Sequence, residues 1–536
     1  MNKKNHKGYW IPLLHAHLPF VKHPDYDYFL EEQWLFEAIS ESYIPLLMNM
    51  KRMVDEDIDF RLTISLSPPL LEMLSDEHLM DKYVNYLNRL IELSTREIKR
   101  LKVDRDFRHL AGFYKTRYEE IRSFYSEFLK RDVVEGFRYF NKLGKIEIIT
   151  SCATHGLLPL LNVTPGTVEA QVRIAVESHH TYFGSPPNGI WLPECAYYEG
   201  LDGLLDKYGI RFFFLDSHGL MRGSPVPRYG VYAPVYTDRG VAAFGRDLES
   251  SGQVWSAEEG YPGDFHYRDF YRDAGFDLDF DYIKPYISPD GIRVFTGIKY
   301  HRITGRGEHK EPYDPGAAMD RAKEHAGHFC DARKRQAQDL GVFMERPPVL
   351  VSPYDAELFG HWWFEGPDFL YYVFCELRNQ DIIEALTPSE YLKCCPENQV
   401  VSPCPTSWGD RGYYDAWLNE ESDWIYRHLH QMADKMENIA TAYYDETDAL
   451  NVRCLNQLSR ELLLAQSSDW AFLITTNTAR EYSINRLKEH IGNFNTLYEA
   501  LESDKVDARP LEMMENKNSI FGDLDFRIFS NLQCSY

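Results

Sequence analysis

The sequence predicts an α/β fold: a seven-stranded (β/α) barrel with a helical insertion and an α-helical C-terminal domain. Seven short apolar runs punctuate the first two thirds of the 536-residue chain, and polar side chains follow each of them. Two long stretches instead carry apolar residues three to four positions apart, which is typical of amphipathic helices. A chain of this length is too large for one compact core, so we expect more than one domain.

The predicted strands are short and rich in β-branched and aromatic residues, as expected of strands buried on both faces. They are Trp10–Leu14, Phe60–Leu66, Ile146–Thr150, Gly189–Leu192, Arg211–Leu215, Val241–Phe244 and Val349–Val351.

Polar, chemically capable side chains gather just after these strands. In a parallel barrel the carboxyl ends of the strands share one face, and that face carries the active site. We therefore expect a site built from residues in these positions. In chain order they are His15 and His17, Ser67, Thr154 and His155, Glu194, Asp216 and His218, Arg246 and Asp247, and Asp355.

The helical stretches set the predicted domain boundaries. Ser75 to Gly144 is too long for one crossover helix, so we assign 75–144 to a helical insertion. The pattern becomes helical again after Val400–Pro405, where VVSPCP interrupts it. The prediction is a catalytic barrel over 1–74 and 145–403, and a helical C-terminal domain over 404–536.

The segment from Pro225 to Arg246 is rich in proline, glycine and tyrosine. We expect a long loop or hairpin near the strand ends, where such loops often act as lids.

Composition limits the possible partners. A net charge of −24 argues against nucleic acid or an anionic membrane as the main partner. No apolar run is long enough to span a membrane and no signal peptide is evident. The nine cysteines are odd in number and scattered, so we expect reduced thiols in a cytoplasmic protein and no cysteine zinc site.

Two histidines lie two residues apart in HAHLPF. Residues two apart on a strand point the same way, so His15 and His17 are expected to enter one pocket. There they either bind a metal ion or hydrogen-bond a polar ligand. His155, in TSCATHG, is a weaker candidate for the same pocket.

Two carboxylic acids carry the chemical hypothesis. Glu194 follows Trp191 in GIWLPECAY, where a ring and a rigid turn remove water and shift a carboxyl pKa. Asp355 lies among aromatic residues in SPYDAELFGHWW. Two carboxyl groups on different strands of one barrel are the minimum set for glycoside chemistry. Rings at Trp408 and Trp417, with Asp469 in SSDW, offer a platform for a sugar.

These strings together resemble glycoside hydrolase family 57, and within it the 1,4-alpha-glucan branching enzymes. HAHLPF, EIITSCATHG, WLPECAY and SPYDAELFGHWWFEG look like its first four motifs, in order, and VWSAEEGYPGD looks like the branching type. The resemblance implies that Glu194 is the nucleophile and Asp355 the general acid/base. It places eight further residues along the substrate: His15, His17, His155, Trp191, Trp255, Trp408, Trp417 and Asp469.

The resemblance also implies an α-glucan substrate, a monomer or small homo-oligomer, and no metal or organic cofactor. Family members carry a mobile lid tyrosine, for which Tyr229, Tyr232 and Tyr236 are all candidates here. The sequence around Pro225–Gly240 diverges from branching enzymes, which leaves the balance between chain transfer and hydrolysis open.

Three alternatives remain. Within the same family, the chain is an α-amylase or a 4-α-glucanotransferase. In another class, it is a metal-dependent hydrolase resembling sugar deacetylases, with His15, His17 and Asp355 as ligands. A non-enzymatic glycogen-binding or regulatory protein is disfavoured by the presence of both carboxylic acids.

Overall fold

A single mixed sheet forms the centre of the computed structural model, which describes residues 7–256, 260–305, 307 and 309–532. Its strand order is β6-β7-β5-β4-β3-β2-β1-β8, with β9 beside β1. All neighbouring strands in the described chain run parallel except β6 and β7. The strands are β1 (Gly8–Ala16), β2 (Leu62–Leu66), β3 (Ile146–Thr150), β4 (Gly189–Ile190), β5 (Phe212–Leu215), β6 (Val235–Tyr236), β7 (Ala242–Gly245), β8 (Val349–Asp355) and β9 (Ile383–Ala385).

The seven predicted strands correspond to β1–β5, β7 and β8, so the predicted (β/α) barrel is confirmed. Its sheet curls until the end strands meet: the backbone N–H of Asp247, just after β7, donates to the carbonyl of Val351 in β8 over 2.9 Å. Two strands were not predicted. β6 and β9 are only two and three residues long, too short to produce a periodic pattern.

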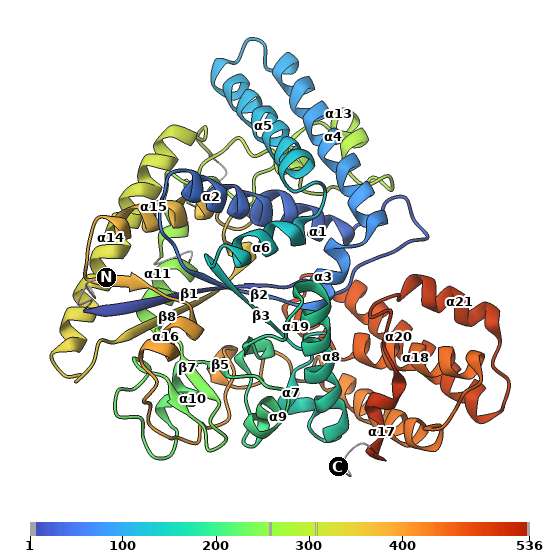
Figure 1. Ribbon diagram of the computed structural model, residues 1–536. Coiled ribbons are helices and arrows are strands. Elements are labelled where there is room, and N and C mark those ends of the chain that lie inside the picture. Colours follow the sequence, from blue (N-terminus) through green and yellow to red (C-terminus); the bar gives the residue numbers. More distant parts are fainter. Residues whose placement is uncertain (1–6, 257–259, 306, 308, 533–536) are drawn as a thin grey trace.

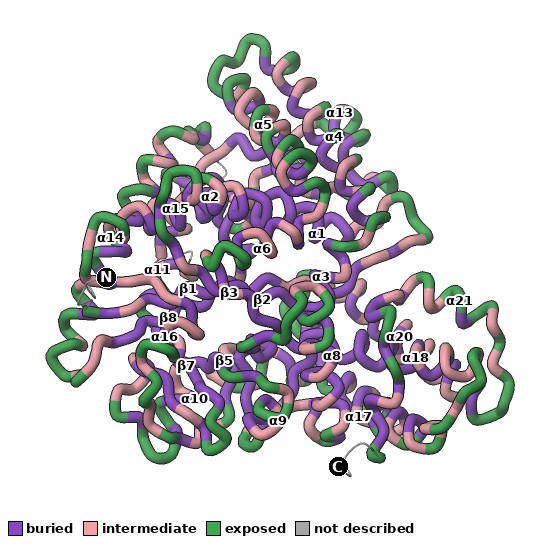
Figure 2. The backbone as a smooth tube through the Cα atoms, viewed as in Figure 1, coloured by how far each residue is buried: buried purple, intermediate pink, exposed green. Residues whose placement is uncertain are grey.

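Alternation along the strands creates two apolar layers. In β1, Ile11 and Leu13 belong to a cluster inside the barrel, whereas Trp10 and Leu14 pack with the surrounding helices. Most of the central sheet is coloured as buried in Figure 2, together with the inner parts of the helices around it. Because side chains alternate along a strand, His15 continues the inward-facing series at the carboxyl end of β1. The interior of the barrel is therefore apolar along most of β1 and polar at the carboxyl end of the strand, where the site was expected.

Helices connect the strands and cover the outside of the sheet (Figure 1). A five-residue π-helical turn, Ile39–Tyr43, joins the first two of them. They are α1 (Glu32–Ala38), α2 (Ile44–Asp55), α3 (Pro68–Leu74), α7 (Leu158–Leu161), α8 (Pro165–Phe183), α9 (Leu201–Lys207), α10 (Ser217–Met221), α11 (Leu248–Trp255), α12 (Ala274–Asp277), α13 (Phe280–Ile283), α14 (Pro315–Gly341), α15 (Gly366–Arg378) and α16 (Pro388–Cys394).

The segment predicted as a helical insertion contains α4 (Glu77–Arg100), α5 (Arg105–Ser123) and α6 (Val133–Lys142). An aspartate caps each helix: the side chains of Asp76, Asp104 and Asp132 accept backbone N–H groups in the first turn. The pair α4 and α5 extends away from the sheet at the top of Figure 1, whereas α6 packs against β3.

The C-terminal region is helical, as predicted. It lies beside the barrel at the lower right of Figure 1. An isolated β-bridge between Gly156 and Ser467 ties it to the loop after β3. Its helices are α17 (Asp423–Ala442), α18 (Ala449–Ala465), α19 (Ser468–Thr476), α20 (Arg480–Glu502) and α21 (Ala508–Lys517).

The hairpin predicted between Pro225 and Arg246 is present, but its position differs from that expected of a lid over the site. The segment after β5 does form a hairpin, but Tyr236 pairs with Ala242 at the start of β7. The carbonyl of Tyr232 accepts the N–H of Val349, the first residue of β8, whereas Asp355 is its last. The seven residues of β8 span about 20 Å. The hairpin therefore lies at the opposite end of the barrel from Asp355, where Tyr229 lines a cavity of about 690 Å³.

No helix within the described residues combines the length and the apolar content needed to cross a membrane.

Candidate active site

Strand register brings the first site residues together. His15 on β1 is paired with Ser65 on β2 and with Asp355 on β8. All three side chains belong to the inward-facing series at the carboxyl ends of their strands. The predicted strand-end residues His15 and Asp355 therefore lie side by side, level with each other along their strands.

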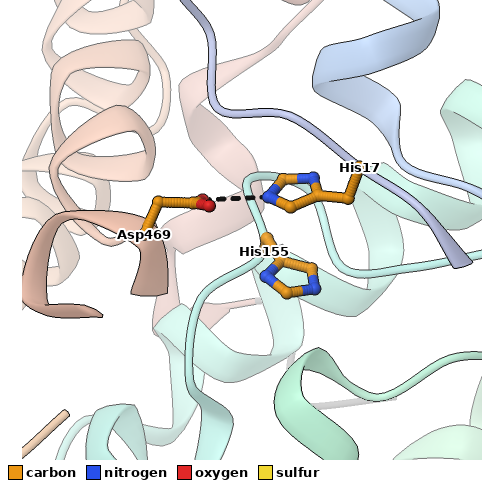
Figure 3. Close-up of side chains that lie close together, drawn as sticks. All are labelled: His17, His155 and Asp469. Carbon is orange, nitrogen blue, oxygen red and sulfur yellow. Dashed lines mark hydrogen bonds and ion pairs between the residues drawn. The ribbon is translucent and has the colours of Figure 1, made fainter. Parts of the chain in front are cut away.

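Three imidazoles form a stack, and two of them come from HAHLPF. The ring centroids of His17 and His155 lie 3.9 Å apart, and those of His15 and His155 lie 5.0 Å apart, with all planes within 20°. The rings of His15 and His17 lie together, as expected of residues that enter one pocket, with 5.8 Å between their centroids. His17 Nε2 also lies 2.9 Å from Asp469 Oδ2, so the C-terminal helices reach the same pocket (Figure 3).

Glu194 follows β4 in a left-handed backbone conformation, with φ of 60°. Such conformations are uncommon for residues other than glycine and cluster at functional sites. Both carboxylate oxygens accept a hydrogen bond: Trp408 Nε1–H donates to Oε2 over 2.9 Å, and Ser468 Oγ–H donates to Oε1 over 3.0 Å. The carboxyl group is thereby held in one orientation.

The environment of Glu194 changes its acidity. Burial raises the pKa of this carboxyl to about 7; the negative charges of Asp469 and Asp355 add to the rise, and the hydrogen bonds from Trp408 and Ser468 oppose it. Because the charge of Asp355 contributes to this rise, the two carboxyl groups interact electrostatically.

Asp355 is even more strongly perturbed. Burial raises the pKa of its carboxyl well above the usual value, the nearby carboxyl of Glu357 adds to this, and the Arg246 guanidinium opposes it. Tyr43 donates a short hydrogen bond to Glu357, and burial raises the pKa of Glu357 to about 7. The surroundings of Asp355 therefore favour its protonated form, which can donate a proton.

The tryptophans occupy different depths. Trp408 is half-buried and lies between Trp191, 4.7 Å away between centroids, and Trp255, 6.2 Å away. Trp191 is fully buried inside the barrel beside His15. Trp417 is also buried, against Phe472, and its indole N–H has no protein partner.

One group of side chains in the described chain could offer three ligand atoms to a metal ion: His17, His155 and Asp469, with those atoms within 4.8 Å of one another. This differs from the set proposed for a metal-dependent hydrolase, His15, His17 and Asp355. In the structure the four ring nitrogens of His17 and His155 already have hydrogen-bond partners in Ser67, Asp469, Ser468 and His15. The cluster is thus satisfied as a hydrogen-bond network.

Sequence reasoning included Ser67 among the site residues but did not assign Ser65 or Ser468 to the site. Ser65 and Ser67 bond His15 and His17, and Ser468 bonds Glu194. The spacing of the two serines in TISLSPP matches that of the two histidines in HAH, and this parallel could have revealed Ser65. Nothing in the sequence signals the contact made by Ser468.

A family comparison covers most of the chain. The model of glycosyl hydrolase family 57 matches residues 13–404, which include both carboxylic acids. The chain belongs to glycosyl hydrolase family 57. A second model, described as the C-terminal region of 1,4-alpha-glucan branching enzymes, matches residues 428–529, which include Ser468 and Asp469.

Proteins similar to this chain carry two different descriptions. A 1,4-alpha-glucan branching enzyme of Thermococcus kodakarensis is 35% identical, over 96% of this chain and 77% of that protein. The crystal structure of an alpha-amylase from Thermotoga maritima is 46% identical with a TM-score of 0.92, covering 97% of this chain and 99% of the other. That of a family 57 branching enzyme from Pyrococcus horikoshii is 34% identical with a TM-score of 0.87, covering 98% and 97%.

Proposed function

We propose that this family 57 protein is a retaining 1,4-alpha-glucan branching enzyme. It cleaves an α-1,4 bond of a glucan such as amylose and transfers the released chain to a 6-hydroxyl. The observation that carries the proposal is the source of the groups around Glu194. Ser468 and Asp469 lie in the segment that matches branching-enzyme C-terminal regions, and they contact Glu194 and His17.

In the first step Glu194 attacks the anomeric carbon. The C1–O4 bond breaks as a C1–O bond to the carboxylate forms, and Asp355 gives its proton to the departing O4. The acidities suit these roles, since burial favours the protonated form of Asp355 while Glu194, with a pKa of about 7, is partly ionised at neutral pH.

In the second step an acceptor 6-hydroxyl attacks the same carbon. Asp355, now ionised, takes the hydroxyl proton, a new C1–O6 bond forms, and Glu194 leaves as a carboxylate. Two displacements preserve the anomeric configuration, and enzymes of this kind hold their two carboxyl groups about 5–5.5 Å apart. His15, His17, His155, Asp469 and the tryptophans are proposed to line the substrate. No metal or organic cofactor takes part.

The test is linkage analysis of the products formed from amylose. New α-1,6 linkages support branching. Glu194→Gln should lower kcat by at least about 10³-fold while the fold is kept, because the neutral amide cannot form the covalent intermediate. Activity in a chelator should match the untreated enzyme. An active Glu194→Gln enzyme would remove Glu194 from its role, and loss of activity in chelator would favour the metal-dependent alternative.

An alpha-amylase is the second candidate, because the Thermotoga maritima structure described by that name is 46% identical to this chain. The same carboxylic acids serve hydrolysis when water replaces the acceptor hydroxyl. The amylose experiment separates the two: reducing ends that accumulate without α-1,6 linkages identify an amylase, and linear chains of altered length identify a 4-α-glucanotransferase.

A further inference from the structure

Glu194 is the end of a chain of hydrogen bonds that runs into the barrel. Ser468 Oγ lies 3.0 Å from Glu194 Oε1 and 3.0 Å from His155 Nδ1. His155 Nε2 lies 3.0 Å from His15 Nε2, and His15 Nδ1 lies 3.2 Å from Ser65 Oγ. Apart from Glu194, the residues joined by these hydrogen bonds are at most 3% exposed.

The ionised carboxylate of Glu194 determines the direction of every bond in this chain. A carboxylate only accepts, so Ser468 must donate its hydroxyl hydrogen to it, and His155 must then donate from Nδ1 to Ser468. Burial lowers the pKa of both His155 and His15 well below the usual value, so both rings are neutral. His155 Nε2 therefore accepts from His15 Nε2–H, and His15 Nδ1 accepts from Ser65.

This series of hydrogen bonds ends at Ser65 without a group that could supply a proton. Beyond Ser65 the next acceptor is the backbone carbonyl of Thr150, 3.4 Å from the serine oxygen, and Thr150 is fully buried. Supplying a proton to Glu194 along this path would leave Ser65 as a buried alkoxide, which is prohibitively costly. The chain therefore orients and stabilises the carboxylate and does not deliver protons.

We propose that Ser468, supplied by the C-terminal helical region and held by His155 and His15, is a positioning residue that fixes Glu194 in its ionised, attacking orientation. The proposal rests on the proposed role of Glu194 as nucleophile. It gives the C-terminal helices a direct part in the chemistry, since their first residue in α19 bonds the reacting carboxylate.

Backbone contacts hold Ser468 in place. Its N–H donates to the carbonyl of His155 over 3.1 Å, so the serine and the histidine share a backbone and a side-chain hydrogen bond. His155 has φ of 59° and, like Glu194, lies in the left-handed region. Backbone conformations of this kind persist only where the surrounding contacts hold them, as the hydrogen bonds of Ser468 do for the loops of His155 and Glu194.

The test is the pH profile of kcat/KM on amylose for Ser468→Ala, Ser468→Thr and a control. Ser459→Ala is the control, because Ser459 is a fully buried serine of α18 that bonds only Leu455 O and Met436 Sδ. Other groups that act on Glu194 are Asp469, Asp355, Trp408, His155 and Tyr426, and all stay unchanged in these variants.

Ser468→Ala should lower kcat/KM about 10- to 100-fold, the usual effect of removing a hydrogen bond to a charged group. It should also move the acidic limb of the profile to higher pH by about one unit, because the hydroxyl favours the ionised carboxylate. Ser468→Thr should restore most of both, and Ser459→Ala should leave both unchanged.

An acidic limb that stays in place in folded Ser468→Ala enzyme, judged by circular dichroism, overturns the proposal. So does an equal shift in Ser459→Ala. If Ser468→Thr unfolds, the Ser468→Ala profile alone decides. Failure of the proposed function itself is separate, since it shows as activity in Glu194→Gln.

Discussion

At the scale of single residues, the strain at Glu194 is the feature that most needs an explanation. Glu194 and Cys195 both have positive φ, at 60° and 52°. The turn is held by Cys195 N–H donating to Leu192 O, and by Trp408 N–H donating to Glu194 O, each over 2.9 Å. Trp408 thus bonds both the backbone and the side chain of Glu194. These hydrogen bonds hold the strained turn and thereby fix the carboxylate where the proposed reaction needs it.

Glu194→Gln should stabilise the protein at alkaline pH. The pKa of Glu194 is raised from 4.5 to about 7, so the folded state disfavours its ionised form. The resulting penalty is absent below pH 4.5, grows as the pH rises to 7 and is complete above it. We expect the variant to gain about 1–3 kcal/mol in unfolding free energy at pH 8 and almost nothing at pH 4.

Denaturant unfolding at both pH values measures this difference. Glu199→Gln is the control, since Glu199 is an exposed carboxyl in the same loop. A gain at pH 8 no larger than that of the control would show that burial of Glu194 carries no cost.

Glu194 and Asp355 can be identified from the sequence because each lies in a distinctive local motif. Ser468 cannot be identified in this way, because it lies 274 positions from Glu194 and meets it only in the folded chain. Trp417 shows a different limit of sequence reasoning. It was predicted to belong to a platform for a sugar, whereas the structure buries its ring against Gly409, which has no side chain to displace it.

At the scale of elements, strand prediction succeeded where burial on both faces produced short, continuous apolar runs. β3 was predicted with its observed bounds. β1 was predicted four residues too short, because it begins two residues earlier, at Gly8, and continues two residues further, through polar His15 to Ala16. The hairpin failed for a different reason. Its proline- and tyrosine-rich composition predicts a connection, but composition does not determine which end of the barrel the connection covers.

Gly189→Ala should disturb the site through β4. This strand has two residues, and a Cβ on Gly189 would lie 2.1 Å from the ring of Phe212 on β5. The clash forces the two strands apart, five residues before Glu194. We expect a loss of about 1–3 kcal/mol in stability, typical of overpacking, together with a fall in kcat.

Thermal unfolding and initial rates on amylose test this change. Gly203→Ala in α9 is the matched control, because the nearest atom to its Cβ would be Arg239 Nε at 3.9 Å, and alanine favours helix. Equal stability of the two variants would show that β4 can move away from Phe212 without cost.

At the scale of the whole molecule, the site belongs to two parts of the chain. The barrel supplies both carboxylic acids and the three histidines, and the C-terminal helices supply Ser468 and Asp469. The bond between His17 and Asp469 joins these parts within the site itself (Figure 3). The sequence predicts each part separately, but their contact depends on side chains more than 450 positions apart, as the separation of 452 between His17 and Asp469 shows.

A double-mutant cycle on His17→Gln and Asp469→Asn should reveal coupling between the barrel and the helices. Although burial opposes it, the charge and hydrogen bond of His17 hold the pKa of Asp469 well below its usual value. The stabilisation is therefore complete above about pH 4 and is lost as the pH falls further. We expect a coupling of about 1–3 kcal/mol at pH 7, measured from the unfolding transitions of the four proteins, and a smaller one at pH 3.

The pair Arg453 and Glu515 serves as the control. It lies within the C-terminal helices and is partly exposed, so its own cycle should give at most about 1 kcal/mol. A coupling for His17 and Asp469 no greater than this would mean that the two parts are held together by apolar packing alone, and that this bond serves only the site.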